Sequence, residues 1–182
     1  MAFTPGCGKS SLTRRRFNEL AERWICTKPV AFTIDICGTP GCGKSSLMRR
    51  HLDGEFGSES LKSCTLVFHT NKGVYYLNCN EGISDNPDGR IIMFNLCSDF
   101  DKEVKTMESV LCRNDKPSIL CGNMIDRKDA RNPDSLKQIM TDYSVSYYYA
   151  ISAKSFYNYE KPFLSLLKEI TNQPDLNFIA IA

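Results

Sequence analysis

The chain contains 182 residues, which is enough for one ordinary domain with a complete core. A hydrophobic content of 42%, a charged content of 24% and a net charge of +2 are typical of a globular protein, and they give no reason to expect nucleic-acid binding. No apolar run approaches the ~20 residues of a membrane span and no signal-peptide pattern opens the chain, so we expect no membrane association. The nine cysteines are spaced too widely for a CxxC redox pair or a zinc site, which favours a reducing compartment.

The first segment, residues 1–28, is expected to be an N-terminal extension that carries an internal repeat. Residues 4–12 recur as residues 39–47, but in the first copy Phe3 replaces the leading glycine. The chain before it is also too short to form the strand that would hold such a loop. We therefore interpret this copy as a non-functional duplicate, and a second phosphate site is the less favoured alternative.

An amphipathic helix is expected in the same extension. Its apolar residues recur at helical spacing, namely Phe17, Leu20, Ala21, Trp24 and Ile25. The favoured hypothesis is that residues 11–26 pack on an apolar surface of the domain, and partner binding is the alternative. The preceding arginine run, 14–16, would also suit a nuclear-import or phosphate-binding cluster.

The second segment, residues 29–182, alternates between strand and helix patterns. Strands are expected at 30–37, 65–70, 74–78, 90–96, 118–122 and 147–151, and helices at 45–53, 100–112, 134–142 and 156–171. Residues 71–73 predict a hairpin between the second and third strands. This alternation predicts an α/β domain with a mostly parallel sheet and helices on both faces.

A phosphate-binding loop is expected after the first strand, because residues 38–45 match GxxxxGK[ST] between a strand and a helix. Glycines let backbone N–H groups surround phosphates, and the helix N-terminus adds the positive end of its dipole. In this motif Lys44 reaches the β- and γ-phosphates, and the Ser45 hydroxyl ligates Mg²⁺. The expected phosphate-binding residues are Gly38, Gly41, Cys42, Gly43, Lys44, Ser45 and Ser46.

Two later motifs predict that the bound base is guanine. Residues 122–126 stand in the place of an NKxD motif, whose aspartate (here Asp126) accepts hydrogen bonds that guanine offers and adenine does not. Met124 replaces the lysine of that motif, so it can lie along the base but carries no charge. Residues 151–154 then match an SAK motif, whose backbone N–H meets the guanine carbonyl oxygen. The expected guanine-binding residues are Asn123, Met124, Asp126, Ser152, Ala153 and Lys154.

These motifs and their surroundings resemble the Ran family of Ras-like small GTPases. The resemblance is carried by residues 55–56, 66–71, 91–94, 119–123, 151–155, 157–164 and 174–178. It implies a P-loop NTPase fold, GTP or GDP with Mg²⁺ as ligands, and a role in nucleocytoplasmic transport, hence location in the nucleus and cytoplasm. By the same resemblance, the implied partners are importin-type receptors, an exchange factor and a GTPase-activating protein.

The resemblance fails in the segments that respond to the nucleotide state. Residues 57–65 are too few for a complete first switch, and Ser63 and Thr65 are the nearest candidates for its Mg²⁺-sensing threonine. Residues 78–82 replace the DTAGQ motif, so Glu81 is the candidate metal-side carboxylate beside Ser45. No residue stands for the glutamine that orients the attacking water, and we therefore expect no catalytic residue and weak or absent GTP hydrolysis.

The spacing also predicts that one helix is missing. A crossover between parallel strands needs about a dozen residues or more, including its helix. Only nine positions run from Glu81 through Gly89, so the switch II helix of the family does not fit.

Two other functions remain as alternatives. A non-catalytic Ran mimic or scaffold would bind Ran partners without a nucleotide cycle. A P-loop kinase would share the phosphate-binding loop, but residues 123–126 and 152–154 argue against it.

Overall fold

The computed structural model describes residues 30–57, 59–113 and 115–179. The hypotheses on the N-terminal repeat, the arginine run and the amphipathic helix lie outside the described residues. Within the described part, the predicted α/β class and the mostly parallel sheet are confirmed.

One six-stranded sheet forms the centre of the domain, with the strand order β2-β3-β1-β4-β5-β6. Only the pairing of β2 with β3 is antiparallel, and it is the predicted hairpin. The central strand β4 is buried along almost its whole length, as expected for a parallel strand covered on both faces. The strands are β1 (Val30–Gly38), β2 (Ser63–Thr70), β3 (Gly73–Glu81), β4 (Gly89–Asn95), β5 (Ser118–Asn123) and β6 (Tyr147–Ala150).

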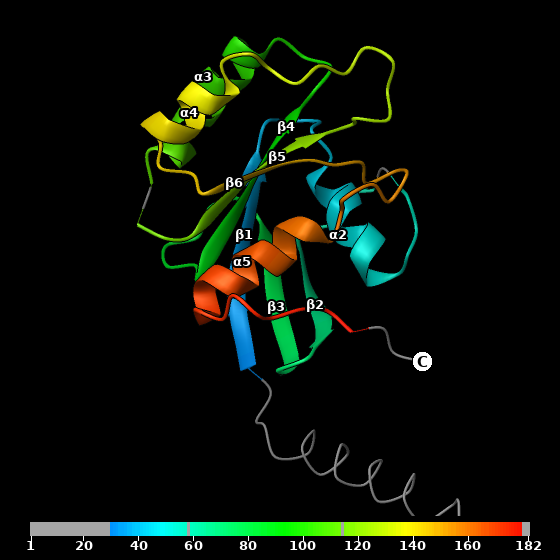
Figure 1. Ribbon diagram of the computed structural model, residues 1–182. Coiled ribbons are helices and arrows are strands. Elements are labelled where there is room, and N and C mark those ends of the chain that lie inside the picture. The colour runs from blue at the N-terminus through cyan, green and yellow to red at the C-terminus, as the bar shows by residue number, and fades with distance from the viewer. Residues whose placement is uncertain (1–29, 58, 114, 180–182) are drawn as a thin grey trace, which may run out of the picture.

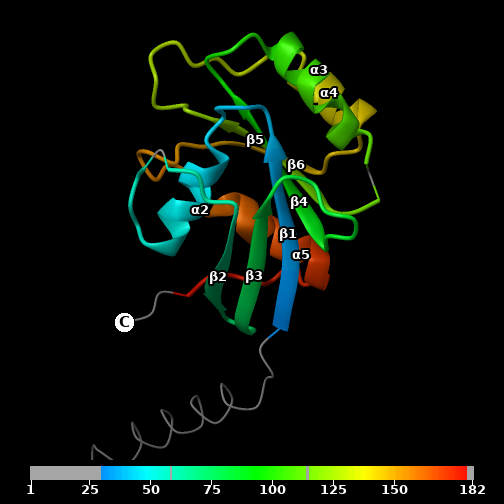
Figure 2. The same ribbon diagram turned by 180° about the vertical axis from the view of Figure 1, so that it is seen from behind.

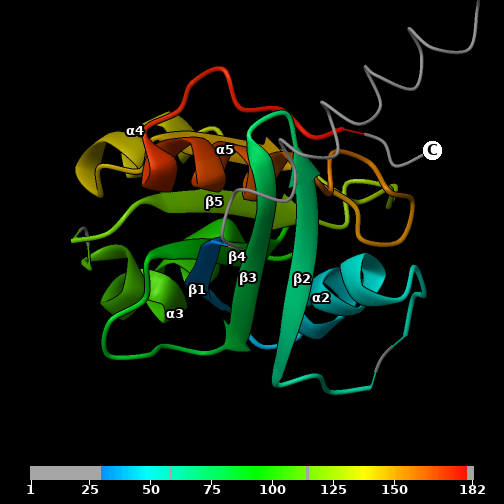
Figure 3. The same ribbon diagram turned by 90° about the horizontal axis from the view of Figure 1, so that it is seen from below.

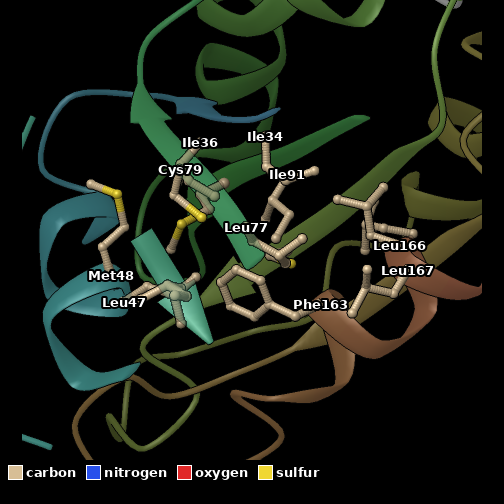
Figure 4. Packing of buried hydrophobic residues seen from close by; sticks show 14 of the residues in the cluster. Ile34, Ile36, Leu47, Met48, Leu77, Cys79, Ile91, Phe163, Leu166 and Leu167 are labelled. Carbon is tan, nitrogen blue, oxygen red and sulfur yellow. The ribbon is translucent and has the colours of Figure 1, made fainter. Parts of the chain in front are cut away.

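Four helices of the described residues cover the sheet, and two separate apolar clusters show which face each helix covers. The helices are α2 (Lys44–Leu52), α3 (Phe100–Leu111), α4 (Leu136–Asp142) and α5 (Lys161–Thr171). Helices α2 and α5 pack on one face, with Leu47, Met48 and Phe163 in the larger cluster (Figure 4). Helices α3 and α4 pack on the other face around Phe94 and Met107 (Figure 1). Along the sheet, α2 lies beside β2 (Figure 3) and α5 lies against β4, β5 and β6.

The last helix begins later than the sequence pattern indicates. The apolar spacing predicts a helix from residue 156, whereas α5 begins at Lys161. Phe156 and Asn158 have positive φ angles of 61° and 52°, which interrupt a right-handed helix before it can start. Pro162 then occupies the first turn, where a missing N–H costs nothing.

The connection between β3 and β4 contains no helix, as predicted, and the strand register explains how so short a segment can cross β1. Glu81 lies opposite Ile36 of β1, and Gly89 lies opposite Ile34. The chain therefore moves back by two positions along β1, or about 7 Å, while it crosses two strand spacings of about 5 Å each. Residues 82–88 span that distance without a helix.

Polar contacts fasten this connection to β1. The backbone N–H of Gly82 donates to Ile36 O at 3.0 Å, and that of Asp88 donates to Thr33 O at 2.8 Å. Between them, Ser84 donates to both carboxylate oxygens of the fully buried Asp35, at 2.8 Å each. The connection thus satisfies a buried carboxylate and stays close to the sheet.

Among the described residues, no helix covers the outer part of one sheet face. Thr65, Val67 and Asn78 alternate with the core residues of β2 and β3, so they point away from α2, and all three are exposed. Figure 2 shows β2 and β3 from this side, with no helix in front of them. No described helix therefore packs on this side of β2 and β3.

The buried His51 of α2 should make the fold less stable in mild acid. His51 packs against the rings of Phe68, Tyr159 and Phe163, and burial lowers its pKa from 6.5 to about 4. The unfolded chain therefore binds a proton below pH 6.5 that the folded chain accepts only near pH 4. From pH 7 to pH 5 the free energy of unfolding should fall by about 2 kcal/mol because of this group.

Urea unfolding at the two pH values measures this effect, with His51→Gln as the comparison. The variant should lose most of the difference between pH 7 and pH 5. An equal difference in both proteins would assign the acid sensitivity to other groups.

Candidate functional site

The loop after β1 has the backbone geometry that a phosphate-binding loop needs. The φ angles of Gly38, Gly41 and Gly43 are 135°, 74° and 96°. Residues with a Cβ atom rarely adopt such positive φ angles. At Gly38 a Cβ atom would overlap the Met93 backbone, and at Gly43 it would overlap the Asn123 amide. The Thr39 N–H donates to Met93 O at 3.2 Å, which ties the loop to the end of β4.

Helix α2 begins at Lys44, directly after this loop. The first N–H groups of a helix have no acceptor within the helix, and together with the dipole they favour an anion. Gly43 supplies no side-chain cap to these groups. Ser46 lies in the same first turn, and its hydroxyl donates to Gly57 O at 3.1 Å.

Three polar side chains meet at the N-terminus of α2. The Lys44 ammonium donates to Thr39 O at 3.0 Å and lies 3.5 Å from the Glu81 carboxylate. The Ser45 hydroxyl donates to the other Glu81 oxygen at 2.8 Å. The structure therefore brings together the two residues that the sequence predicts as metal ligands.

The oxygens of Ser45 and Glu81 are of the type that Mg²⁺ prefers. Magnesium takes few protein ligands and completes its octahedron with water and substrate phosphates. Among the described residues no group of three or more His, Cys, Asp or Glu side chains gathers into a metal site. This donor pair fits a magnesium that depends on a phosphate ligand.

Asn123, at the end of β5, connects the loop after β1 to the loop after β6. Its amide nitrogen donates to Cys42 O at 2.8 Å, and its amide oxygen accepts from the Ala153 N–H at 3.2 Å. Asn123 is only 3% exposed, so both contacts are sheltered from water. Its position fixes the two loops relative to each other.

The two segments predicted to read guanine are also joined. The Ser152 hydroxyl donates to one Asp126 carboxylate oxygen at 2.6 Å and accepts from the Ser155 N–H at 2.9 Å. Ser152 is fully buried, so it orients the Asp126 carboxylate and takes no part in the pocket lining. Met124 has a φ angle of 70°, which turns the chain between Asn123 and Asp126.

These segments enclose an open pocket of about 270 Å³. It lies at the edge where the carboxyl ends of parallel strands β1, β5 and β6 meet, which is where α/β sheets bind ligands. The lining residues are Gly43, Ser46, Phe56, Asn123, Met124, Asp126, Arg127, Ala153 and Lys154.

Phe56 and Arg127 line this pocket, although the sequence motifs do not include them among the site residues. Phe56 is 52% exposed, so its ring is open to a molecule that enters the pocket. The sequence signal for Phe56 was its place among the residues that carry the resemblance, shortly after the helix.

Arg50 in α2 is a further residue that the motifs do not reveal. Its guanidinium donates to three backbone carbonyls, Ala153 O at 2.8 Å, Lys154 O at 2.6 Å and Gly54 O at 2.6 Å. The Phe156 ring lies 3.8 Å from its central carbon. Arg50 thus fixes the position of the loop after β6. It is largely buried, with 9% of its surface exposed.

Three predicted residues take positions that limit their role. Cys42 is completely buried and burial raises the pKa of its thiol, so only its backbone faces the loop. Thr65, a candidate for the Mg²⁺-sensing residue, instead donates to Asn78 Oδ1 at 2.8 Å on the uncovered sheet face. Ser63 lies opposite Asn80 in the same hairpin.

No protein-family model matches the chain. In the part of the chain that the structure describes, no helix is both long and apolar enough to cross a membrane.

Proposed function

We propose that this protein is a guanine-nucleotide-binding protein of the Ran type with a P-loop NTPase domain. The observation that carries the proposal is that Gly43, Asp126 and Ala153 line one and the same pocket. These residues belong to three motifs that are separate in the sequence and that together would bind phosphate, the Watson–Crick edge of guanine and its carbonyl oxygen.

In this proposal each part of the nucleotide has a named partner. The N–H groups at the start of α2 and the Lys44 ammonium bind the phosphates, for which Lys44 exchanges its contacts with loop carbonyls and Glu81. Ser45 and Glu81 would hold Mg²⁺, and the metal would neutralise phosphate charge. Asp126 accepts two hydrogen bonds from guanine, and the exposed Phe56 ring packs against the base.

The base preference is tested by competition against a fluorescent GDP analogue. GTP and GDP should displace the analogue, and ATP should not. Asp126→Ala should weaken GDP binding by a factor of ten or more, since a hydrogen bond to a charged acceptor contributes about 1.5–3 kcal/mol. Asp134→Ala, at an exposed position outside the pocket, is the matched control and should bind like the parent. Equal displacement by ATP would overturn the guanine assignment.

The proposal also predicts very slow hydrolysis. No residue stands for the glutamine that positions the attacking water, and in the described residues no helix lies between β3 and β4 to carry one. Single-turnover measurements with radiolabelled GTP should show little release of phosphate, and a Ran-type activating protein should increase the rate only slightly. A large increase would show that another residue positions the water.

A second function is favoured by the contacts of Glu81. Its carboxylate already pairs with both Lys44 and Ser45, so bound phosphate must compete with an internal ion pair. If that pair persists, the protein is a non-catalytic Ran mimic or scaffold that binds importin-type receptors, the exchange factor or the activating protein in the nucleus and cytoplasm. Chromatography of the nucleotide released from purified, denatured protein separates the two functions, because the scaffold would release none.

A further inference from the structure

Two cysteines that are far apart in the sequence lie side by side in the β2–β3 hairpin. Cys64 and Cys79 are directly opposite each other in the antiparallel ladder. Residues in such a pair have Cα atoms about 4.5–5.5 Å apart, which is within the range of 4.4–6.8 Å that disulfides span. Both thiols are free in this structure.

The two side chains share one face of the hairpin. Cys79 is completely buried in the larger cluster (Figure 4), and Cys64 packs at the margin of the same cluster, where it is half-buried. Alternation along the strands places both on the face that α2 covers, opposite to the exposed Thr65 and Asn78. The sulfur atoms therefore point in the same direction from neighbouring strands.

The surroundings make the two thiols chemically unequal. Cys64 is half-buried and open to a reactant from solvent, whereas Cys79 is completely buried beside it. The thiolate is the nucleophilic form of cysteine, and reactive cysteines are partly exposed. Cys64 is therefore the thiol that a reactant from solvent reaches first, and Cys79 is the neighbour that can react with it afterwards.

We propose that Cys64 and Cys79 form a redox site in which Cys64 is the attacking residue and Cys79 the resolving residue, with hydrogen peroxide as the oxidant. The Cys64 thiolate attacks one peroxide oxygen, the O–O bond breaks, and hydroxide leaves as Cys64 becomes a sulfenic acid. The Cys79 sulfur then attacks the Cys64 sulfur, and the sulfenic hydroxyl leaves with the thiol proton as water. The dithiol has lost two electrons, which the peroxide has gained.

The position of the pair gives this chemistry a consequence for the hairpin. The Glu81 N–H donates to Lys62 O at 2.7 Å, just beyond the cysteine pair in the same ladder. A disulfide would join β2 to β3 covalently next to the residue that contacts Lys44 and Ser45. The redox site does not depend on nucleotide binding, so it stands even if the proposed function is wrong.

The test uses the full-length protein, fully reduced and then exposed to hydrogen peroxide. Peptide mapping by mass spectrometry without reductant should identify a peptide pair linked through Cys64 and Cys79, and the chain should lose two hydrogen atoms. In Cys79→Ser the link should disappear, and dimedone should trap a sulfenic acid at Cys64. In Cys64→Ser the link should disappear and Cys79 should stay reduced.

The exposed Cys112 provides the matched control, because it is accessible but has no role in the proposed pair. Cys112→Ser should form the Cys64–Cys79 link as fast as the parent. A link to any other cysteine, oxidation of Cys112 while Cys64 and Cys79 stay reduced, or a link that forms only in urea would each overturn the proposal. Circular dichroism before and after oxidation confirms that the measured chain is folded.

Discussion

Replacing Gly38 by alanine should destabilise the domain by about 4 kcal/mol or more, which places it among the largest effects of single substitutions. The φ angle of 135° is unfavourable for any residue with a Cβ atom. In addition, the new Cβ would overlap the backbone of Met93, which belongs to the buried strand β4 and cannot move aside like a flexible side chain. Strands β1 and β4 would have to separate at the end of β1, where the loop before α2 begins.

Urea unfolding followed by circular dichroism measures this loss, and Gly54→Ala is the matched control. Gly54 also has a positive φ, of 74°, but a Cβ there would meet no atom within 4 Å. Gly54→Ala should therefore lower the free energy of unfolding by only about 1–2 kcal/mol, which is the conformational penalty alone. Equal losses in the two variants would mean that the contact with Met93 is relieved by a small shift of the backbone.

Replacing Arg50 by methionine should cost about 3–5 kcal/mol and should also disorganise the pocket. Methionine keeps much of the side-chain volume but removes three charge-assisted hydrogen bonds, each of which contributes about 1.5–3 kcal/mol when its acceptor is sheltered. Ala153 is buried, so its carbonyl loses its partner outright, while Gly54 and Lys154 are exposed and can be hydrated instead. The stacking of the guanidinium on Phe156 is lost as well.

The neighbouring arginine separates this effect from the loss of a charge on α2. Arg49 pairs with Asp53 at 3.9 Å and with the exposed Glu59 at 3.3 Å, and ion pairs of this kind contribute about 0–1 kcal/mol. Arg49→Met should therefore unfold at nearly the same urea concentration as the parent. If Arg50→Met is also as stable as the parent, then solvent or another side chain replaces the contacts of Arg50 to the loop after β6.

Local sequence patterns were sufficient for most of the secondary structure. The apolar runs and the turn residues 71–73 predicted each strand and the hairpin to within a few positions, since a buried strand or an alternating hairpin depends on neighbouring residues. Spacing alone also predicted that no helix joins Glu81 to Gly89. The start of α5 was predicted too early, because left-handed turns at Phe156 and Asn158 do not interrupt the apolar spacing.

The segments predicted to bind phosphate and guanine could be picked out in the sequence, because each motif is made of a few adjacent residues. Only the tertiary structure decided how they meet. Asn123 joins the loops after β1 and β6, and Ser152 turns its hydroxyl to the carboxylate of Asp126. These contacts depend on strand order and register, which no local pattern encodes.

The same reason explains the residues that the sequence did not single out. Arg50 resembles any arginine on an amphipathic helix until the fold places three carbonyls around its guanidinium. Cys64 and Cys79 appear as two isolated cysteines until the hairpin register sets them opposite each other. The sequence by itself determined most of the helices and strands and the motifs proposed to bind a nucleotide. The tertiary structure decided which distant groups share a site, because only long-range pairing and burial bring them within contact distance.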